Sequence, residues 1–223
     1  MRARYERNIP SLTEEESQLL RTKKVAVIGC GGLGGYIIEQ LARLGIGTIR
    51  IVDGDVFEES NLNRQLFSDV TVLGKPKTEV SQARIAAVNP DVKVEALHGY
   101  LDEHNAADFL RGCDAVVGAL DNIYTRRVLE RNCEELGIPY VYGAIHGWVA
   151  QVAVDMPGQH LIEKMYPEGA TFKDKSSLSF TPGFCASMQT ALCVKYLVGR
   201  PVESGTIFYF DLLNQEFETI PMV

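Results

Sequence analysis

One segment of the chain, Gly29-Cys30-Gly31-Gly32-Leu33-Gly34, fits the pattern G-x-G-x-x-G. Glycines allow a backbone to come close to phosphate groups, and a helix that begins there offers N–H groups that no helical carbonyl uses. Asp53 ends the next apolar run, at the place where a carboxylate can accept hydrogen bonds from ribose hydroxyls. These residues predict a nucleotide site. A glycine-rich packing turn is the alternative.

Amide and cationic side chains follow in two short segments, Asn61-Leu62-Asn63-Arg64-Gln65 and Gly74-Lys75-Pro76-Lys77. The triphosphate of ATP and a departing pyrophosphate carry several negative charges, which Arg and Lys can neutralise, whereas a dinucleotide carries no triphosphate. ATP therefore explains these segments better than NAD does. Lys75 and Lys77 flank a proline that can start a helix, so an exposed helix start is the alternative for both, and Lys77 is the better candidate.

A carboxylate follows a buried apolar run at Leu120-Asp121-Asn122. Ligands of parallel sheets bind at the carboxyl ends of the strands, and Mg²⁺ prefers oxygen ligands. Asp121 is therefore predicted to bind magnesium, although it could instead cap the helix that follows. We find no convincing acid/base residue for hydride transfer, so an NAD-dependent oxidoreductase is the less favoured interpretation.

The elements that must position these residues alternate along the first two-thirds of the chain. Apolar runs predict strands over residues 24–28, 48–52, 92–97, 115–119 and 139–142, and helical spacing predicts helices over 36–44, 75–89, 106–111 and 125–136. This alternation predicts an α/β fold with a Rossmann-like, mostly parallel sheet and helices on both faces.

The pattern changes after residue 145. We expect a strand over 149–154, an irregular and exposed crossover segment over 157–179, a buried helix over 184–197, and an antiparallel pair over 206–210 and 216–220. The tail is thus predicted to extend the same sheet. Residues 1–223 are predicted to form one domain, with an N-terminal helical arm (1–22), a nucleotide-binding half (23–145) and a second half (146–223) that includes the crossover segment.

Composition excludes several other classes. The 223 residues are 46% hydrophobic and 23% charged, which suits a globular chain, and the net charge of −7 argues against a nucleic-acid coat or an anionic membrane surface. No apolar run approaches the roughly 20 residues that span a bilayer. The absence of an apolar leader and the odd number of cysteines predict a cytoplasmic location. Cys185 lies near a predicted helix start, where the pKa of a thiol can fall, but a small buried residue is the alternative.

Together these segments resemble the ThiF/MoeB/HesA family, the bacterial relatives of ubiquitin-activating enzymes. The resemblance runs from Arg4 to about Phe217 and rests on the following segments: Arg4-Tyr5-x-Arg7, GCGGLG, Val52-Asp53-Gly54-Asp55, NLNRQ, GKPK, Asn89-Pro90, LDN and Ser187-Met188-Gln189. It implies ATP-dependent adenylation of the C-terminal glycine carboxylate of a small ubiquitin-like sulfur carrier, with release of pyrophosphate, for thiamine or molybdenum/tungsten cofactor synthesis.

The resemblance also implies that residues 146–223 form the half that binds the carrier, and it implies roles for individual residues. Asp53 would hold the ribose, and Asp121 would hold Mg²⁺. Arg7 would reach into the site of a second copy, which implies a homodimer with composite sites. The implied catalytic residues are Arg7, Arg64, Lys77 and Asp121. The implied nucleotide-binding residues are Gly29, Gly31, Gly32, Leu33, Gly34, Asp53, Asp55, Asn61, Arg64, Gln65, Lys77, Leu120, Asp121 and Asn122.

The chain departs from the family pattern at three places. Leu120 stands where the family usually has threonine. The five cysteines form no C-x-x-C pair, so no zinc site is expected, and residues 157–179 contain no cysteine, so no covalent intermediate with the carrier is expected. We therefore expect a β-grasp carrier that ends in Gly-Gly and a separate sulfur donor as partners, with no nucleic acid or membrane. An acceptor of another kind (a tRNA nucleoside or a peptide) and a non-catalytic scaffold remain alternatives.

Overall fold

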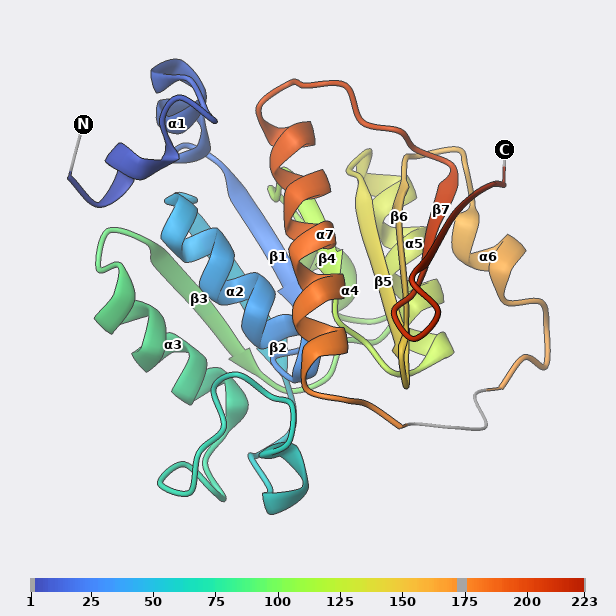
Figure 1. The fold of residues 1–223 in the computed structure, drawn as a ribbon, viewed down its shortest axis with the longest axis horizontal. Helices are drawn as coiled ribbons and strands as arrows, with labels where there is room; N and C mark the ends of the chain where they lie inside the picture. Colours follow the sequence, from blue (N-terminus) through green and yellow to red (C-terminus); the bar gives the residue numbers. More distant parts are fainter. Residues whose placement is uncertain (1–2, 172–175, 223) are drawn as a thin grey trace.

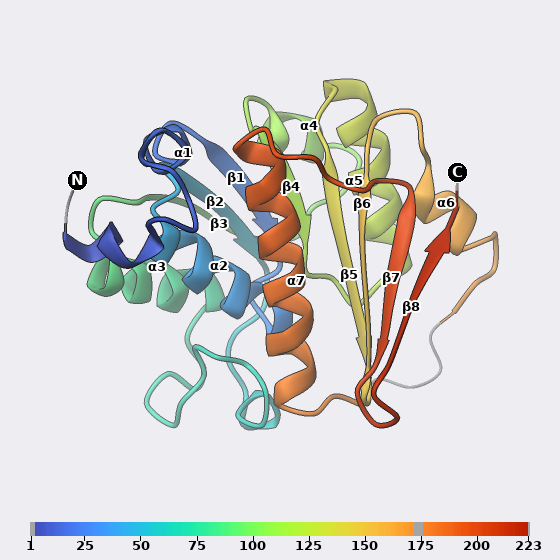
Figure 2. The ribbon, with the colours of Figure 1, turned by 45° about the horizontal axis from the view of Figure 1, so that its top comes forward.

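A single mixed sheet organises the chain in the computed structural model, which describes residues 3–171 and 176–222. Its strand order is β3-β2-β1-β4-β5-β6-β7-β8, which can be followed in Figure 2, and Figure 1 shows the same fold in a second view. The strands are β1 Lys24–Ile28, β2 Thr48–Asp53, β3 Lys93–His98, β4 Ala115–Gly118, β5 Tyr140–His146, β6 Val149–Asp155, β7 Thr206–Asp211 and β8 Glu216–Pro221.

The sheet has a parallel part and an antiparallel part. Strands β3, β2, β1, β4 and β5 pair in parallel, and β5 to β8 pair antiparallel. The helices are η1 Ala3–Asn8, α1 Glu14–Leu20, α2 Gly32–Leu44, η2 Glu59–Asn61, α3 Lys77–Val88, α4 Ala106–Leu110, α5 Ile123–Leu136, α6 Leu161–Met165 and α7 Phe180–Leu197. The predicted Rossmann-like sheet with a C-terminal antiparallel extension is thereby confirmed.

Alternate residues of the central strands point to opposite faces, and both faces are covered. Val25 and Val27 of β1 join a cluster with apolar residues of α2, α3 and α7, whereas Ala26 and Ile28 join a second cluster with α4, α5 and α6. Figure 2 shows α2, α3 and α7 on the near side of the sheet and α4 and α5 behind it. Burial on both faces explains why β1 is almost continuously apolar.

Helix α7 is fixed to the sheet through a buried amide. Gln189 Nε2 donates to the carbonyl oxygens of Gly118 (2.8 Å), the last residue of β4, and of Val141 (3.3 Å), near the start of β5. A Cβ atom on Gly143 would lie 2.3 Å from the Gln189 side chain, so only glycine leaves room for it. This contact holds α7 against β4 and β5.

A short helix, α6, lies within the segment that the sequence predicts as irregular. Leu161 and Ile162 are buried, and the carboxylate of Glu130 on α5 accepts hydrogen bonds from the N–H groups of Ile162 (2.5 Å) and Glu163 (3.2 Å). The prediction of an exposed, irregular segment was therefore wrong for residues 161–165, and residues 172–175 lie outside the described residues. None of the helices within residues 3–171 and 176–222 combines the length and apolar character that crossing a membrane requires.

Candidate active site

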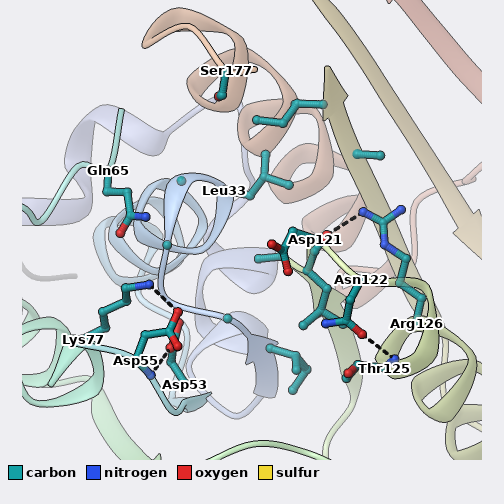
Figure 3. Close-up of a pocket in the computed structure, with 18 of the residues that line it drawn as sticks. Leu33, Asp53, Asp55, Gln65, Lys77, Asp121, Asn122, Thr125, Arg126 and Ser177 are labelled. Atoms are coloured by element: carbon teal, nitrogen blue, oxygen red, sulfur yellow. Dashed lines mark hydrogen bonds and ion pairs between the residues drawn. The ribbon is translucent and has the colours of Figure 1, made fainter. Parts of the chain in front are cut away.

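A cavity of about 720 Å³ opens at the carboxyl ends of β1, β2 and β4. This volume falls in the range of small-molecule and cofactor sites. Figure 3 shows acidic and cationic side chains from both sides of the glycine loop pointing toward this space. The predicted nucleotide-binding residues that line it are Gly29, Gly31, Gly32, Leu33, Asp53, Asp55, Asn61, Arg64, Gln65, Lys77, Leu120, Asp121 and Asn122. Predicted residues as far apart in the sequence as Gly29 and Asn122 are therefore brought to one cavity.

The glycine loop has little room for side chains. Gly29 has φ +100°, and a Cβ atom there would lie 2.5 Å from the carbonyl oxygen of Ala119. Gly34 packs behind the loop instead of lining the cavity, because a Cβ atom on it would lie 1.8 Å from the carbonyl oxygen of Gly29. Gly34 is thus packed against the loop backbone, and its predicted contact with the nucleotide stays a prediction. Gly31 and Gly32 line the cavity where α2 begins, a suitable position for phosphate oxygens.

Asp53 joins the ends of β1 and β2. Its Oδ2 accepts a hydrogen bond from the Cys30 backbone N–H (2.7 Å), and its Oδ1 accepts one from the Asp55 N–H (2.8 Å). Each carboxylate oxygen has a further lone pair for a ribose hydroxyl. Asp53 can therefore position the glycine loop and bind a ribose at the same time.

Lys77 and Tyr100 hold the carboxylate of Asp55 from two sides. Lys77 Nζ lies 2.8 Å from Asp55 Oδ2, and the Tyr100 hydroxyl donates to Asp55 Oδ1 at 2.7 Å. Burial raises the pKa of Asp55, but the hydrogen bonds from Lys77 and Tyr100 outweigh it, and the net pKa lies below its ordinary value. The side chain of Lys77 is only 7% exposed, so this cation is held within the site, at the start of α3.

The segment around η2 also supplies polar groups to the cavity wall. Asn61 is buried, and its Oδ1 accepts a hydrogen bond from the Glu58 N–H (3.0 Å). Arg64 donates to the Ser60 carbonyl oxygen at 3.1 Å and to the Asn63 side chain at 2.8 Å.

Gln65 lies beside the glycine loop in this wall. A Cβ atom on Gly31 would lie 3.4 Å from the Gln65 side-chain nitrogen. The Gln65 Oε1 atom is buried and has no hydrogen-bond partner among the residues that the structure describes. An unsatisfied amide oxygen at the cavity wall is consistent with a site built to receive a polar ligand.

The turn after β4 presents Asp121 to the cavity. Asn122, and not Asp121, caps α5, since Asn122 Oδ1 accepts a hydrogen bond from the Thr125 N–H at 2.8 Å. The capping alternative for Asp121 was therefore wrong. An exposed carboxylate at this position fits Mg²⁺, because this ion is commonly bound by one or two carboxylates together with substrate phosphates. Within the described ranges no group of three His, Cys, Asp or Glu side chains could hold a metal alone.

Two other predicted residues lie outside the cavity lining. Arg7 is exposed on η1, and its predicted role in the site of a second copy stays a prediction. Cys185 is buried inside α7, and its Sγ lies 3.5 Å from the Gln151 carbonyl oxygen. Burial raises the pKa of the Cys185 thiol to about 12, so the alternative of a small packing residue is confirmed for it.

Tyr100 and Arg126 are among the cavity-lining residues that sequence reasoning missed. Tyr100 lies two residues beyond β3, and this position at the carboxyl end of a parallel strand was a usable signal. Arg126 lies in the first turn of α5, four residues after Asn122. Its importance depends on contacts with residues much later in the chain.

Comparisons with known proteins agree with this geometry. The chain matches the ThiF family over residues 5–223. It is 34% identical to the SAMP-activating enzyme E1 of Haloferax volcanii, over 98% of this chain and 84% of that protein. It is also 34% identical to the sulfur carrier protein adenylyltransferase of Thermus thermophilus, over 97% and 86% of the two chains.

A solved structure shows the same fold. The crystal structure of E. coli MccB with MccA-N7isoASN superposes with a TM-score of 0.86 at 20% identity, over 99% of this chain and 71% of that one. The order of the strands, the cavity and the matched residues lead to one assignment. The chain belongs to the ThiF family and is an adenylyltransferase.

Proposed function

We propose that this adenylyltransferase uses Mg-ATP to activate the C-terminal glycine carboxylate of a small β-grasp sulfur carrier that ends in Gly-Gly. The observation that supports this most strongly is the gathering of Arg64, Lys77 and Asp121 in one cavity beside the glycine loop. A nucleotide with a triphosphate needs such cations, whereas a dinucleotide does not. The relatives named above are described as acting on a sulfur carrier or on SAMP.

The reaction requires positioning and neutralisation of charge. A carboxylate oxygen of the carrier attacks the α-phosphorus of ATP, and the bond from this phosphorus to the oxygen that bridges to the β-phosphate breaks. Pyrophosphate leaves with the electron pair, and the carrier becomes an acyl-adenylate. No protein nucleophile is needed for this step.

Each side of the cavity has a proposed part in this reaction. Asp53 holds the ribose, and the N–H groups at the start of α2 contact phosphate oxygens. Lys77 and Arg64, with Asn61, contact the phosphates and stabilise the charge that develops on the departing pyrophosphate. Asp121 would hold Mg²⁺, which neutralises phosphate charge and helps to orient the triphosphate.

The proposed assembly is a homodimer in which Arg7 of each copy reaches the site of the other. This proposal rests on the exposure of Arg7 and on the resemblance to the family. A separate sulfur donor would then attack the adenylate, since residues 157–179 contain no cysteine. Thiamine and molybdenum/tungsten cofactor synthesis are both compatible with this chemistry.

The test is exchange of labelled pyrophosphate into ATP by the purified protein with Mg²⁺, with and without candidate carriers of the thiamine and molybdopterin types. Exchange that depends on one of these carriers supports adenylation and identifies the pathway. Exchange that depends on a tRNA or a peptide, and on neither carrier, would replace the proposed acceptor. Tight binding of NAD without binding of ATP would overturn the proposal.

A further inference from the structure

Arg126 connects three separate parts of the chain beneath the Asp121 turn. The side chain belongs to α5 and is only 3% exposed. Its Nη2 donates to the carbonyl oxygens of Leu120 (2.5 Å) and Gly143 (3.3 Å), and its Nη1 donates to the hydroxyl of Tyr166 (2.8 Å). Figure 3 shows the guanidinium reaching from α5 to the backbone beside Asp121.

Tyr166 belongs to the crossover segment, residues 157–179, and is firmly held at this point. The Arg126 guanidinium lies over the rings of Tyr142 (4.8 Å to the centroid) and Tyr166 (5.6 Å). The hydroxyls of these two tyrosines are 2.5 Å apart, and Arg127 donates to the Tyr166 carbonyl oxygen. Tyr166, Thr171, Ser176 and Ser177 line the cavity, so these described residues of the crossover segment contribute to its wall.

The contact with Leu120 bears directly on Asp121. The Leu120 carbonyl belongs to the peptide unit that ends at the Asp121 Cα atom, and a peptide unit is planar. Holding this oxygen fixes the plane, and the plane restricts the direction in which the Asp121 side chain leaves the backbone. A small displacement of a positioned group can reduce a reaction rate by about 100-fold.

We propose that Arg126 is a positioning residue that fixes the Leu120–Asp121 peptide and couples it to Tyr166 in the wall of the cavity. This inference rests on the proposed role of Asp121 in binding Mg-ATP. A guanidinium suits this task because its flat fork donates in two directions and stacks on aromatic rings, whereas a lysine ammonium provides neither the fork nor the flat surface.

The test uses the variants Arg126→Lys and Tyr166→Phe, with Arg131→Lys as a matched control, because Arg131 is exposed on the same helix. The first readout is a titration with Mn²⁺ in the presence of ATP, followed by electron paramagnetic resonance, which needs no carrier. The second is the Mg²⁺ dependence of pyrophosphate exchange at saturating ATP and carrier. Thermal unfolding of each variant measures any loss of stability separately.

We expect Arg126→Lys to weaken Mn²⁺ binding and to lower exchange by about 10- to 100-fold at low Mg²⁺, with much of the loss recovered at high Mg²⁺. Tyr166→Phe shifts both readouts in the same direction by a smaller factor, and the double variant behaves like Arg126→Lys alone, because both changes break one network. Arg131→Lys behaves like the wild type.

Unchanged metal dependence in Arg126→Lys, or additive effects in the double variant, would overturn the inference. If Arg126→Lys fails to fold, Tyr166→Phe takes its place in the test, because it leaves the guanidinium in place. Unchanged Mn²⁺ binding and unchanged Mg²⁺ dependence in Tyr166→Phe would then overturn the inference. Absence of exchange in the wild type would count against the proposed function. The Mn²⁺ titration would still report whether Arg126 positions Asp121.

Discussion

The Lys77 ammonium lies 2.8 Å from the Asp55 carboxylate, and the lysine is nearly buried while the aspartate side chain is 52% exposed. The more accessible partner is thus the anion, and Tyr100 also donates to it. This arrangement keeps a cation inside the site while ATP is absent. An arriving phosphate can compete with Asp55 for Lys77, since both are oxygen acceptors with negative charge.

Replacing Lys77 by methionine tests this cation. We expect Lys77→Met to lower kcat/KM for pyrophosphate exchange by about 100-fold or more, because a charged donor near the phosphates is lost. Lys75→Met is the matched control, since Lys75 is exposed two residues earlier and does not line the cavity. Equal exchange rates in the two variants would contradict the assignment.

Asp121 and Asn122 are neighbours with different expected effects. We expect Asp121→Asn to abolish exchange while thermal unfolding stays close to that of the wild type, because this side chain is exposed. Asn122→Ala removes the cap of α5 and should cost about 1 kcal/mol of stability. Urea unfolding and exchange assays on both variants check this. Full exchange activity in Asp121→Asn would contradict the metal assignment.

Mixed dimers test whether Arg7 completes the site of a second copy. Arg7→Ala and Asp121→Asn should each be inactive alone. After unfolding and refolding together in equal amounts, roughly a quarter of the sites should combine an intact Arg7 with an intact Asp121. Partial recovery of exchange would support composite sites. An inactive mixture, with mixed dimers present by native mass spectrometry, would contradict them.

The raised pKa of Asp155 should make the free energy of unfolding depend on pH. Burial raises the pKa of this carboxyl from 3.8 to about 8, and the nearby carboxylates of Glu130 and Glu134 add to the shift. Between these values the folded chain holds one more proton than the unfolded chain, so stability falls as the pH rises. The contribution of Asp155 to the free energy of unfolding is fully present below the pKa of 3.8 in the unfolded chain, and it is lost as the pH rises through about 8.

The variant Asp155→Asn should remove this slope, which for one proton is at most about 1.4 kcal/mol per pH unit. An amide can still accept the hydrogen bond from the Leu161 N–H and can donate to Glu130. Urea unfolding from pH 4 to pH 8 checks this, with Asp108→Asn as an exposed control. If the free energy of unfolding changes with pH in the same way for Asp155→Asn and for the wild type, Asp155 is not the source of this pH dependence.

The sequence predicted those parts of the site that depend on the ends of parallel strands. Asp53 and Asp121 each follow an apolar run, and the carboxyl ends of such strands meet at one edge of the sheet. Their residue types and positions were therefore sufficient to place them together. The glycine loop was predicted for the same reason, although the packing role of Gly34 required the coordinates.

The missed features depend on partners that lie far away in the sequence. Helix α6 has only five residues, too few for a periodic pattern, and Glu130 and Asp155 bind its first N–H groups. Arg126 receives its role from Gly143 and Tyr166. No local pattern around residue 126 contains these contacts, because they arise only when β5 and the crossover segment pack against α5.

The most direct test of the account is mass spectrometry of a Gly-Gly carrier after incubation with the purified protein and Mg-ATP. We predict that the intact carrier gains one AMP on its C-terminal glycine, that pyrophosphate is released in equal amount, and that a carrier without this glycine gains none. A carrier that remains unmodified while the protein binds ATP would contradict the central claim. In that case the same cavity would act on a different acceptor.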